Sequence, residues 1–222
     1  MATHNGVLNS LSGKIGPVVG GNWKGIPYLR SLPTPKSNPV FSEAQLAQKA
    51  RFALGMHFLK AMGELVEITY QSGYGKTKKN AALSRILSQA VGGVYPDLYI
   101  DYTAIEIARG DLKKAERPAV AFTEDNQLRF TWTDNTGMGT AAATDQAILV
   151  AYCPETNDLI WTGNGGMRAA GEGLLDARML MKVIGARGYG VHTWISFRDK
   201  KGERVADGVG GGVVCMRGSI GE

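Results

Sequence analysis

The hydrophobic periodicity of this chain changes once along its length. Between residues 42 and 91, apolar side chains recur every three or four positions, which is the spacing of amphipathic helices. From Leu98 onward, short runs rich in β-branched and aromatic residues alternate with turn residues. Helices followed by many short strands predict an α+β protein that ends in an antiparallel β-sandwich. The expected strands are residues 98–107, 119–122, 128–133, 147–153, 159–162, 174–177, 191–197, 205–207 and 213–216.

Two helices are expected before this change. Ser42 and Gln45 form the S-x-x-Q pattern of a capping box, and the apolar spacing that follows predicts a helix through residues 42–65. Gly55 and Gly63 each cost that helix about 1 kcal/mol relative to alanine, so packing must hold it or a neighbour must approach closely there. A second helix is predicted for residues 77–91, and two consecutive glycines are expected to end it.

The first 42 residues contain no aspartate or glutamate, although they carry four basic residues and five prolines. Without those four basic residues, the chain has 21 Lys+Arg against 20 Asp+Glu, so the net charge of +5 belongs mostly to this segment. Prolines forbid a helix here, and we expect an extended arm with an edge strand at residues 22–32 and a stiff linker at 33–39. The basic residues are Lys14, Lys24, Arg30 and Lys36.

An arm this apolar needs a surface to lie on. Its large side chains alternate with small residues, which suits the addition of a strand to the sheet of another chain. Because the donating and accepting patches differ, such contacts close into a ring or extend into a filament or tube. We therefore expect a non-enzymatic structural protein that self-assembles into a homopolymer through this strand-donating arm. The expected subunit-interface residues are Ile15, Val18, Val19, Trp23, Ile26, Tyr28, Leu29 and Arg30.

Two alternatives stay open. In the first, the arm folds back on its own domain and completes an intramolecular sheet, which predicts a monomer. In the second, the chain is a monomeric binding module that recognises protein, glycan or nucleic acid. Nucleic acid is the least favoured of these partners, because only four positive charges cluster and no dense Lys/Arg tract is present.

Two glycine-rich runs are candidates for a binding function. The run from Gly73 to Thr77 mimics the end of a phosphate-binding loop, but Tyr70 stands where that motif needs glycine. The glycines at residues 208–212 leave room beside the last expected strand for another backbone, so this edge is expected to be receptive to a partner strand. On the neighbouring strand, Trp194 lies on the face opposite the main apolar one and predicts that this second face is covered.

The remaining reactive side chains predict no catalytic residue, no cofactor and no metal ion. His4, His57 and His192 lack metal-ligand spacing, and His57 is expected to pack on a helix face. Cys153 and Cys215 lie far apart without CxxC spacing, and both are expected to be buried free thiols.

The sequence also predicts where the protein is made. No apolar run approaches the roughly 20 residues that a membrane-spanning helix needs. The first residues, MATHNGVLNSLSGKIG, lack the basic and apolar regions of a secretory signal. We expect a cytoplasmic protein or a component of a particle assembled in the cytosol, with an extracellular fibre left open.

Three blocks carry a resemblance that spans nearly the whole chain: SGKIGPVVGGNWKGIPYLRS, FSEAQLAQKARF and GVHTWISF. Through them the chain resembles a bacterial family of uncharacterised domains, often present as several paralogues, and the resemblance implies no known activity. The segments LRFTWTD, DQAILVAY and GVHTWISF make the second half similar to a fibronectin type III or immunoglobulin-like sandwich. The expected division is an arm at residues 1–41, a helical and mixed segment at 42–116 and a β-sandwich domain at 117–222.

Overall fold

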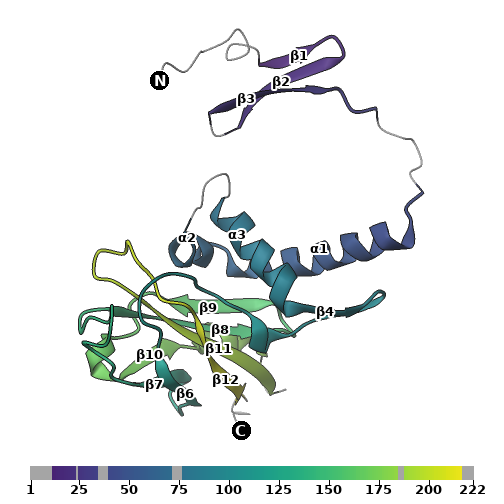
Figure 1. Cartoon of the computed structure of the whole chain (residues 1–222). Coiled ribbons are helices and arrows are strands. Elements are labelled where there is room, and N and C mark those ends of the chain that lie inside the picture. The colour runs from purple at the N-terminus through teal and green to yellow at the C-terminus, as the bar shows by residue number, and fades with distance from the viewer. Residues whose placement is uncertain (1–11, 24, 35–39, 72–76, 185–187, 217–222) are drawn as a thin grey trace, which may run out of the picture. The chain divides into compact units, whose positions relative to one another are not determined.

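A computed structural model describes residues 12–23, 25–34, 40–71, 77–184 and 188–216 (Figure 1). The chain divides into two compact units, Met1–Glu43 and Ala44–Glu222. The predicted three-part division of the chain stays a prediction. Several positions considered above lie outside the described residues, namely His4, Lys24, Lys36, residues 35–39 of the linker and residues 73–76 of the glycine-rich run.

The first unit holds a small antiparallel sheet, which we call the arm sheet. Its strands are β1 (Gly13–Ile15), β2 (Val18–Trp23) and β3 (Ile26–Ser31), in the order β1-β2-β3. The prediction of one strand over residues 22–32 is wrong, because the chain turns between β2 and β3. Gly25 makes this turn with a φ of +83°, and its N–H donates to Asn22 Oδ1 at 2.8 Å.

Helices open the second unit: α1 (Glu43–Met62), α2 (Leu65–Thr69), α3 (Lys78–Arg85) and the π-helical turn η2 (Ile86–Ala90). The predicted close approach at Gly55 is confirmed, since a Cβ there would lie 2.8 Å from Leu87 Cδ2. Gly63 does not lie inside the helix as expected. With a φ of +50°, it follows the last residue of α1 and turns the chain into α2. Thr77 caps α3, because its hydroxyl accepts the N–H of Asn80.

A hairpin of β4 (Val91–Val94) and β5 (Asp97–Ile100) follows. The predicted strand over residues 98–107 is wrong beyond Ile100. Asp101 accepts hydrogen bonds from the N–H and the hydroxyl of Thr103, at 2.9 and 2.6 Å, and this bends the backbone into the 3-10 turn η3 (Tyr102–Ala104).

The rest of the chain forms the expected antiparallel sandwich, so the α+β fold that ends in a β-sandwich is confirmed. One sheet has the order β10-β7-β6 and the other β12-β11-β8-β9. The strands are β6 (Glu116–Phe122), β7 (Gln127–Thr133), β8 (Gln146–Cys153), β9 (Asp158–Thr162), β10 (Glu172–Asp176), β11 (Tyr189–Arg198) and β12 (Val209–Met216). The sequence did not predict the 3-10 turn η4 (Arg168–Ala170) or the helix α4 (Arg178–Ile184).

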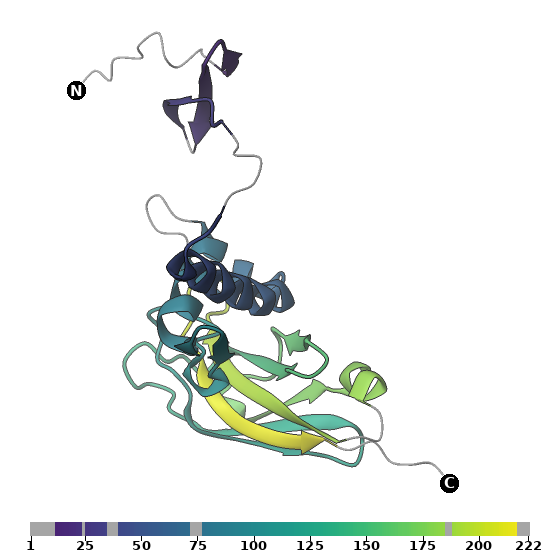
Figure 2. The same cartoon turned by 90° about the vertical axis from the view of Figure 1, so that its right-hand side faces the viewer.

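The four-stranded sheet is covered on both faces. In β11, Val191, Ile195 and Phe197 join the core between the two sheets. Trp194, on the other face, is buried in a second core with side chains of α1, which confirms that this face is covered. Figures 1 and 2 show the helices α1, α2 and α3 on one side of the sandwich. The second unit is therefore three layers deep, with two complete hydrophobic cores.

Candidate interaction site

The eight predicted interface residues all lie in the arm sheet, where strand register sorts them onto two faces. Tyr28 pairs with Gly21, Arg30 with Val19, and Ile26 with Trp23. Paired residues share a face, so these apolar side chains lie together with a cation. The opposite face is aliphatic. One face carries Val19, Trp23, Ile26, Tyr28 and Arg30, and the other carries Ile15, Val18 and Leu29.

Both faces of the arm sheet leave large apolar side chains exposed. Trp23, Tyr28 and Leu29 each keep 45% of their surface, and Ile15 and Ile26 keep 52% and 53%. Gly20 is the one buried residue among residues 12–23 and 25–34. A three-stranded sheet of this size buries too little apolar surface to be stable alone, so it calls for a partner surface.

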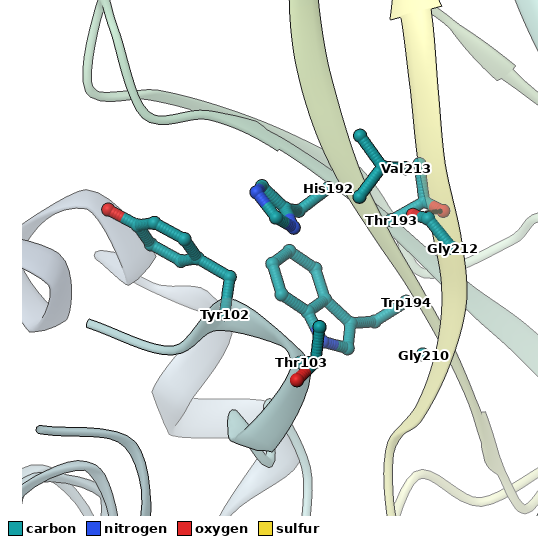
Figure 3. Close-up of a pocket in the computed structure, with 8 residues that line it drawn as sticks. All are labelled: Tyr102, Thr103, His192, Thr193, Trp194, Gly210, Gly212 and Val213. Carbon is teal, nitrogen blue, oxygen red and sulfur yellow. Dashed lines mark hydrogen bonds between the residues drawn. The ribbon is translucent and has the colours of Figure 1, made fainter. Parts of the chain in front are cut away.

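A pocket of about 340 Å³ opens in the second unit between η3, β11 and the edge strand β12, and we call it the ring pocket. Figure 3 shows its rings facing one another. The ring centroids of Tyr102 and His192 are 4.7 Å apart, and those of His192 and Trp194 are 6.1 Å apart. Its lining residues are Tyr102, Thr103, His192, Thr193, Trp194, Gly210, Gly212 and Val213.

One wall of the ring pocket is formed by glycines, which have no side chains to fill the space beside the backbone. A Cβ on Gly210 or Gly212 would meet no atom within 4 Å. The register of β12 shifts opposite Thr193 and Trp194, where Gly211 is the extra residue of a bulge. Val213 stands on the rim with 57% of its surface exposed. Residues 209–212 of this glycine-rich run are therefore part of the edge strand β12, and pairing of this strand with another chain stays a prediction.

The ring pocket is uncharged inside and acidic around it. Burial lowers the pKa of His192, and this outweighs the opposite effect of Glu155 and Asp101, so the imidazole is neutral at pH 7. Burial also raises the pKa of the Tyr102 hydroxyl. Hydrogen bonds from Thr103 lower the pKa of Asp101, which keeps this exposed carboxylate ionised.

Two acids, Asp101 and Glu155, act on His192. Asp101 lies in residues 91–108 and Glu155 in residues 130–167, and neither stretch contains Lys or Arg. The arm has the opposite composition, with basic residues and no acid.

The structure also places the cysteines and His57 considered in the sequence. Cys153 is buried as expected, and burial raises the pKa of its thiol, which disfavours the reactive thiolate. Cys215, expected to be buried, is exposed because it lies on the edge strand. His57, expected to pack, is also exposed. Within the described ranges, no three His, Cys, Asp or Glu side chains gather as a metal site.

Comparison with known proteins places the sequence in a family. A family model described as "Family of unknown function (DUF6266)" matches residues 10–212. The chain belongs to this family. The DUF6266 match covers the whole arm sheet and every lining residue of the ring pocket except Val213. A comparison with curated proteins returned no match.

One solved structure similar to this DUF6266 chain is the fn3 domain of the human collagen alpha-1(XX) chain. The two are 10% identical, with a TM-score of 0.33, and the similarity covers 52% of this chain and 92% of that one. None of the helices in the described residues has the length and apolar content that crossing a bilayer requires.

The sequence pattern predicts only one part of the ring pocket. It predicts a covered face at Trp194, but it predicts a strand at Tyr102, which lies in the 3-10 turn η3. The signal for this half of the DUF6266 site was Asp101 followed two residues later by Thr103, a pattern typical of a turn that ends a strand.

Proposed function

We propose that this protein is a non-enzymatic structural protein that self-assembles through its arm sheet. The observation that carries the proposal is the contrast between the two units. The arm sheet exposes apolar side chains on both faces and has a single buried residue among those described, whereas the second unit has two hydrophobic cores of buried residues. A sheet without a core is stabilised by docking on another surface.

The free energy that each exposed side chain can contribute favours docking of the whole arm sheet rather than of a single residue. Burying the exposed half of a Trp, Ile or Leu side chain contributes about 1 kcal/mol. Association costs roughly 4–15 kcal/mol in lost freedom of motion. Several of the eight residues must therefore be buried together. A donor and an acceptor on the same chain give a head-to-tail contact, which closes into a ring or extends into a filament.

The alternative is a monomeric binding module for protein, glycan or nucleic acid. The ring pocket favours this function class, because pockets walled by aromatic rings bind flat apolar or sugar-like surfaces. The two functions differ in what the isolated chain does. A binding module stays monomeric until its ligand is added, whereas an assembling protein oligomerises by itself.

Removal of residues 1–32 tests the proposal. The second unit keeps both cores, so the shortened chain is expected to fold with the circular dichroism and cooperative melting of a β-rich protein. Size-exclusion chromatography and negative-stain microscopy should show oligomers for the full chain and a monomer for the shortened chain. Equal assembly of both would exclude the arm as the connector. A monomeric full chain would contradict self-assembly and would favour either the binding module or an arm folded back on its own domain.

A further inference from the structure

We propose that the ring pocket receives the side chain of Arg30 from the arm of a second copy of this chain. This assignment rests on the proposed self-assembly and names its acceptor surface. It joins two features that the fold leaves without an explanation: an open pocket of aromatic rings in a non-catalytic body, and an arm face that combines apolar side chains with a cation.

The chemistry of the ring pocket suits a guanidinium group. The His192 ring lies between those of Tyr102 and Trp194, with centroids 4.7 and 6.1 Å away, and this group of rings lines a space of about 340 Å³ (Figure 3). A guanidinium is planar and weakly hydrated, and it stacks on aromatic faces while its N–H groups bind carboxylates. Asp101 and Glu155 are the charged groups that act on His192, and both are acids. A cation entering here meets no competing positive charge among them.

Arg30 is placed to reach into such a pocket. It lies on β3, an edge strand of the arm sheet, and its side chain is exposed. The five ion pairs among the described residues do not include it. Tyr28 and Ile26 precede it on the same face, at intervals of two positions along β3.

The rim of the ring pocket suits these two neighbours of Arg30. Gly210 and Gly212 present backbone without side chains, and Val213 adds an exposed apolar surface. Tyr28 and Ile26 would lie along this part of β12 while the Arg30 side chain enters the pocket beside the rings. The contact buries apolar surface and pairs opposite charges, so the two surfaces are complementary in both hydrophobicity and charge.

Two full-length variants test the two sides of the contact. Arg30→Glu reverses the charge of the donor, and Val213→Arg places bulk and positive charge on the rim of the acceptor. Each should weaken assembly about tenfold or more, measured as the midpoint concentration in sedimentation velocity. Lys182→Glu is the charge control for the first, because Lys182 is exposed on α4. Val183→Arg is the control for the second, because Val183 is exposed to 55% and Val213 to 57%.

Mixing the two variants shows whether the arm binds the pocket of another copy or the pocket of its own chain. The Arg30→Glu chain keeps an intact pocket, and the Val213→Arg chain keeps an intact arm. If the contact joins two copies, an equimolar mixture forms one-to-one dimers that grow no further, while each variant alone stays monomeric. Melting curves that match the unmodified chain establish that both variants are folded.

The outcomes separate the failure of this assignment from the failure of the proposed function. Assembly of Val213→Arg at the unmodified concentration would show that another surface accepts the arm, with self-assembly intact. A monomeric unmodified chain would overturn both. A mixture that stays monomeric would also overturn the assignment, because the intact arm and the intact pocket would then have met without binding.

Discussion

The Nε of Arg168 lies 3.0 Å from Oδ2 of Asp145, and both side chains are removed from solvent. The same guanidinium donates to Asn135 Oδ1 at 2.7 Å and to the backbone oxygen of Lys113 at 2.8 Å. Its carbon lies 3.8 Å from the centroid of the Phe197 ring. Arg168 therefore ties two loops to the core between the two sheets.

Replacing Arg168 with alanine should be strongly destabilising. It leaves Asp145 buried without its charge partner, which typically costs 3–5 kcal/mol, so we expect a loss of about 4 kcal/mol in the free energy of unfolding. Urea denaturation gives this value directly. The matched control is Arg178→Ala, which breaks the exposed pair with Asp176 and should change the free energy of unfolding far less, because solvent screens that pair. Similar losses in the two variants would contradict the assigned role of Arg168.

Gly173→Ala should destabilise the crossing between β10 and the loop before η4. A Cβ at this position would lie 1.8 Å from the backbone oxygen of Gly165, and backbone cannot move aside as a flexible side chain does. We expect a loss of about 3 kcal/mol by urea denaturation, at the upper end of typical overpacking. Gly210→Ala is the control, since a Cβ there meets no atom within 4 Å. An unchanged midpoint for Gly173→Ala would show that this crossing is looser than described.

His192 should make the stability of the chain depend on pH. Its pKa is lowered below 6.5 in the folded state, so the unfolded state binds more protons near that pH. The contribution of neutral His192 to the free energy of unfolding is therefore expected to be fully present above pH 6.5. It should be lost as the pH falls below 6.5. Urea midpoints from pH 7.5 to pH 5 should fall less steeply for His192→Gln. Parallel curves for the two chains would assign the pH dependence to other groups.

Assembly should weaken as salt is added. The proposed contact brings the acid-free arm to a surface with Asp101 and Glu155, and salt screens such exposed charges. Raising NaCl from roughly 50 to 500 mM should increase the midpoint concentration of assembly several-fold. Arg30→Gln should flatten this dependence. An assembly that strengthens with salt would indicate a purely apolar contact.

The order of elements could be predicted from local patterns. Alternation in residues 191–197 identified β11 and its two faces, and Gly55 indicated a close neighbour that is Leu87. The turn at Gly25 was missed because apolar residues continue on both sides of it, so the run reads as one strand. The helix α4 was missed because only seven residues form it, and its stability comes from packing of Leu180 and Ile184 rather than from a long periodic stretch.

The candidate site was predictable on one side only. The arm residues stand together in the sequence, so composition and charge identified them before any fold was known. The ring pocket is lined by residues of η3, β11 and β12. Two of its rings, Tyr102 and His192, are about ninety positions apart in the sequence. Such a pocket exists only once the strand order is known. The turn at Asp101 is a local sequence pattern that places Tyr102 in η3. The rings on β11 that pack against Tyr102 cannot be predicted from a local pattern.

Sedimentation velocity of the unmodified chain across roughly 1 to 100 µM, a range that brackets a micromolar dissociation constant, tests the central claim most directly. The account predicts that the mass rises with concentration past that of a dimer, and that the chain without residues 1–32 stays at the mass of one copy. A single species of 23.8 kDa across the whole range would contradict it.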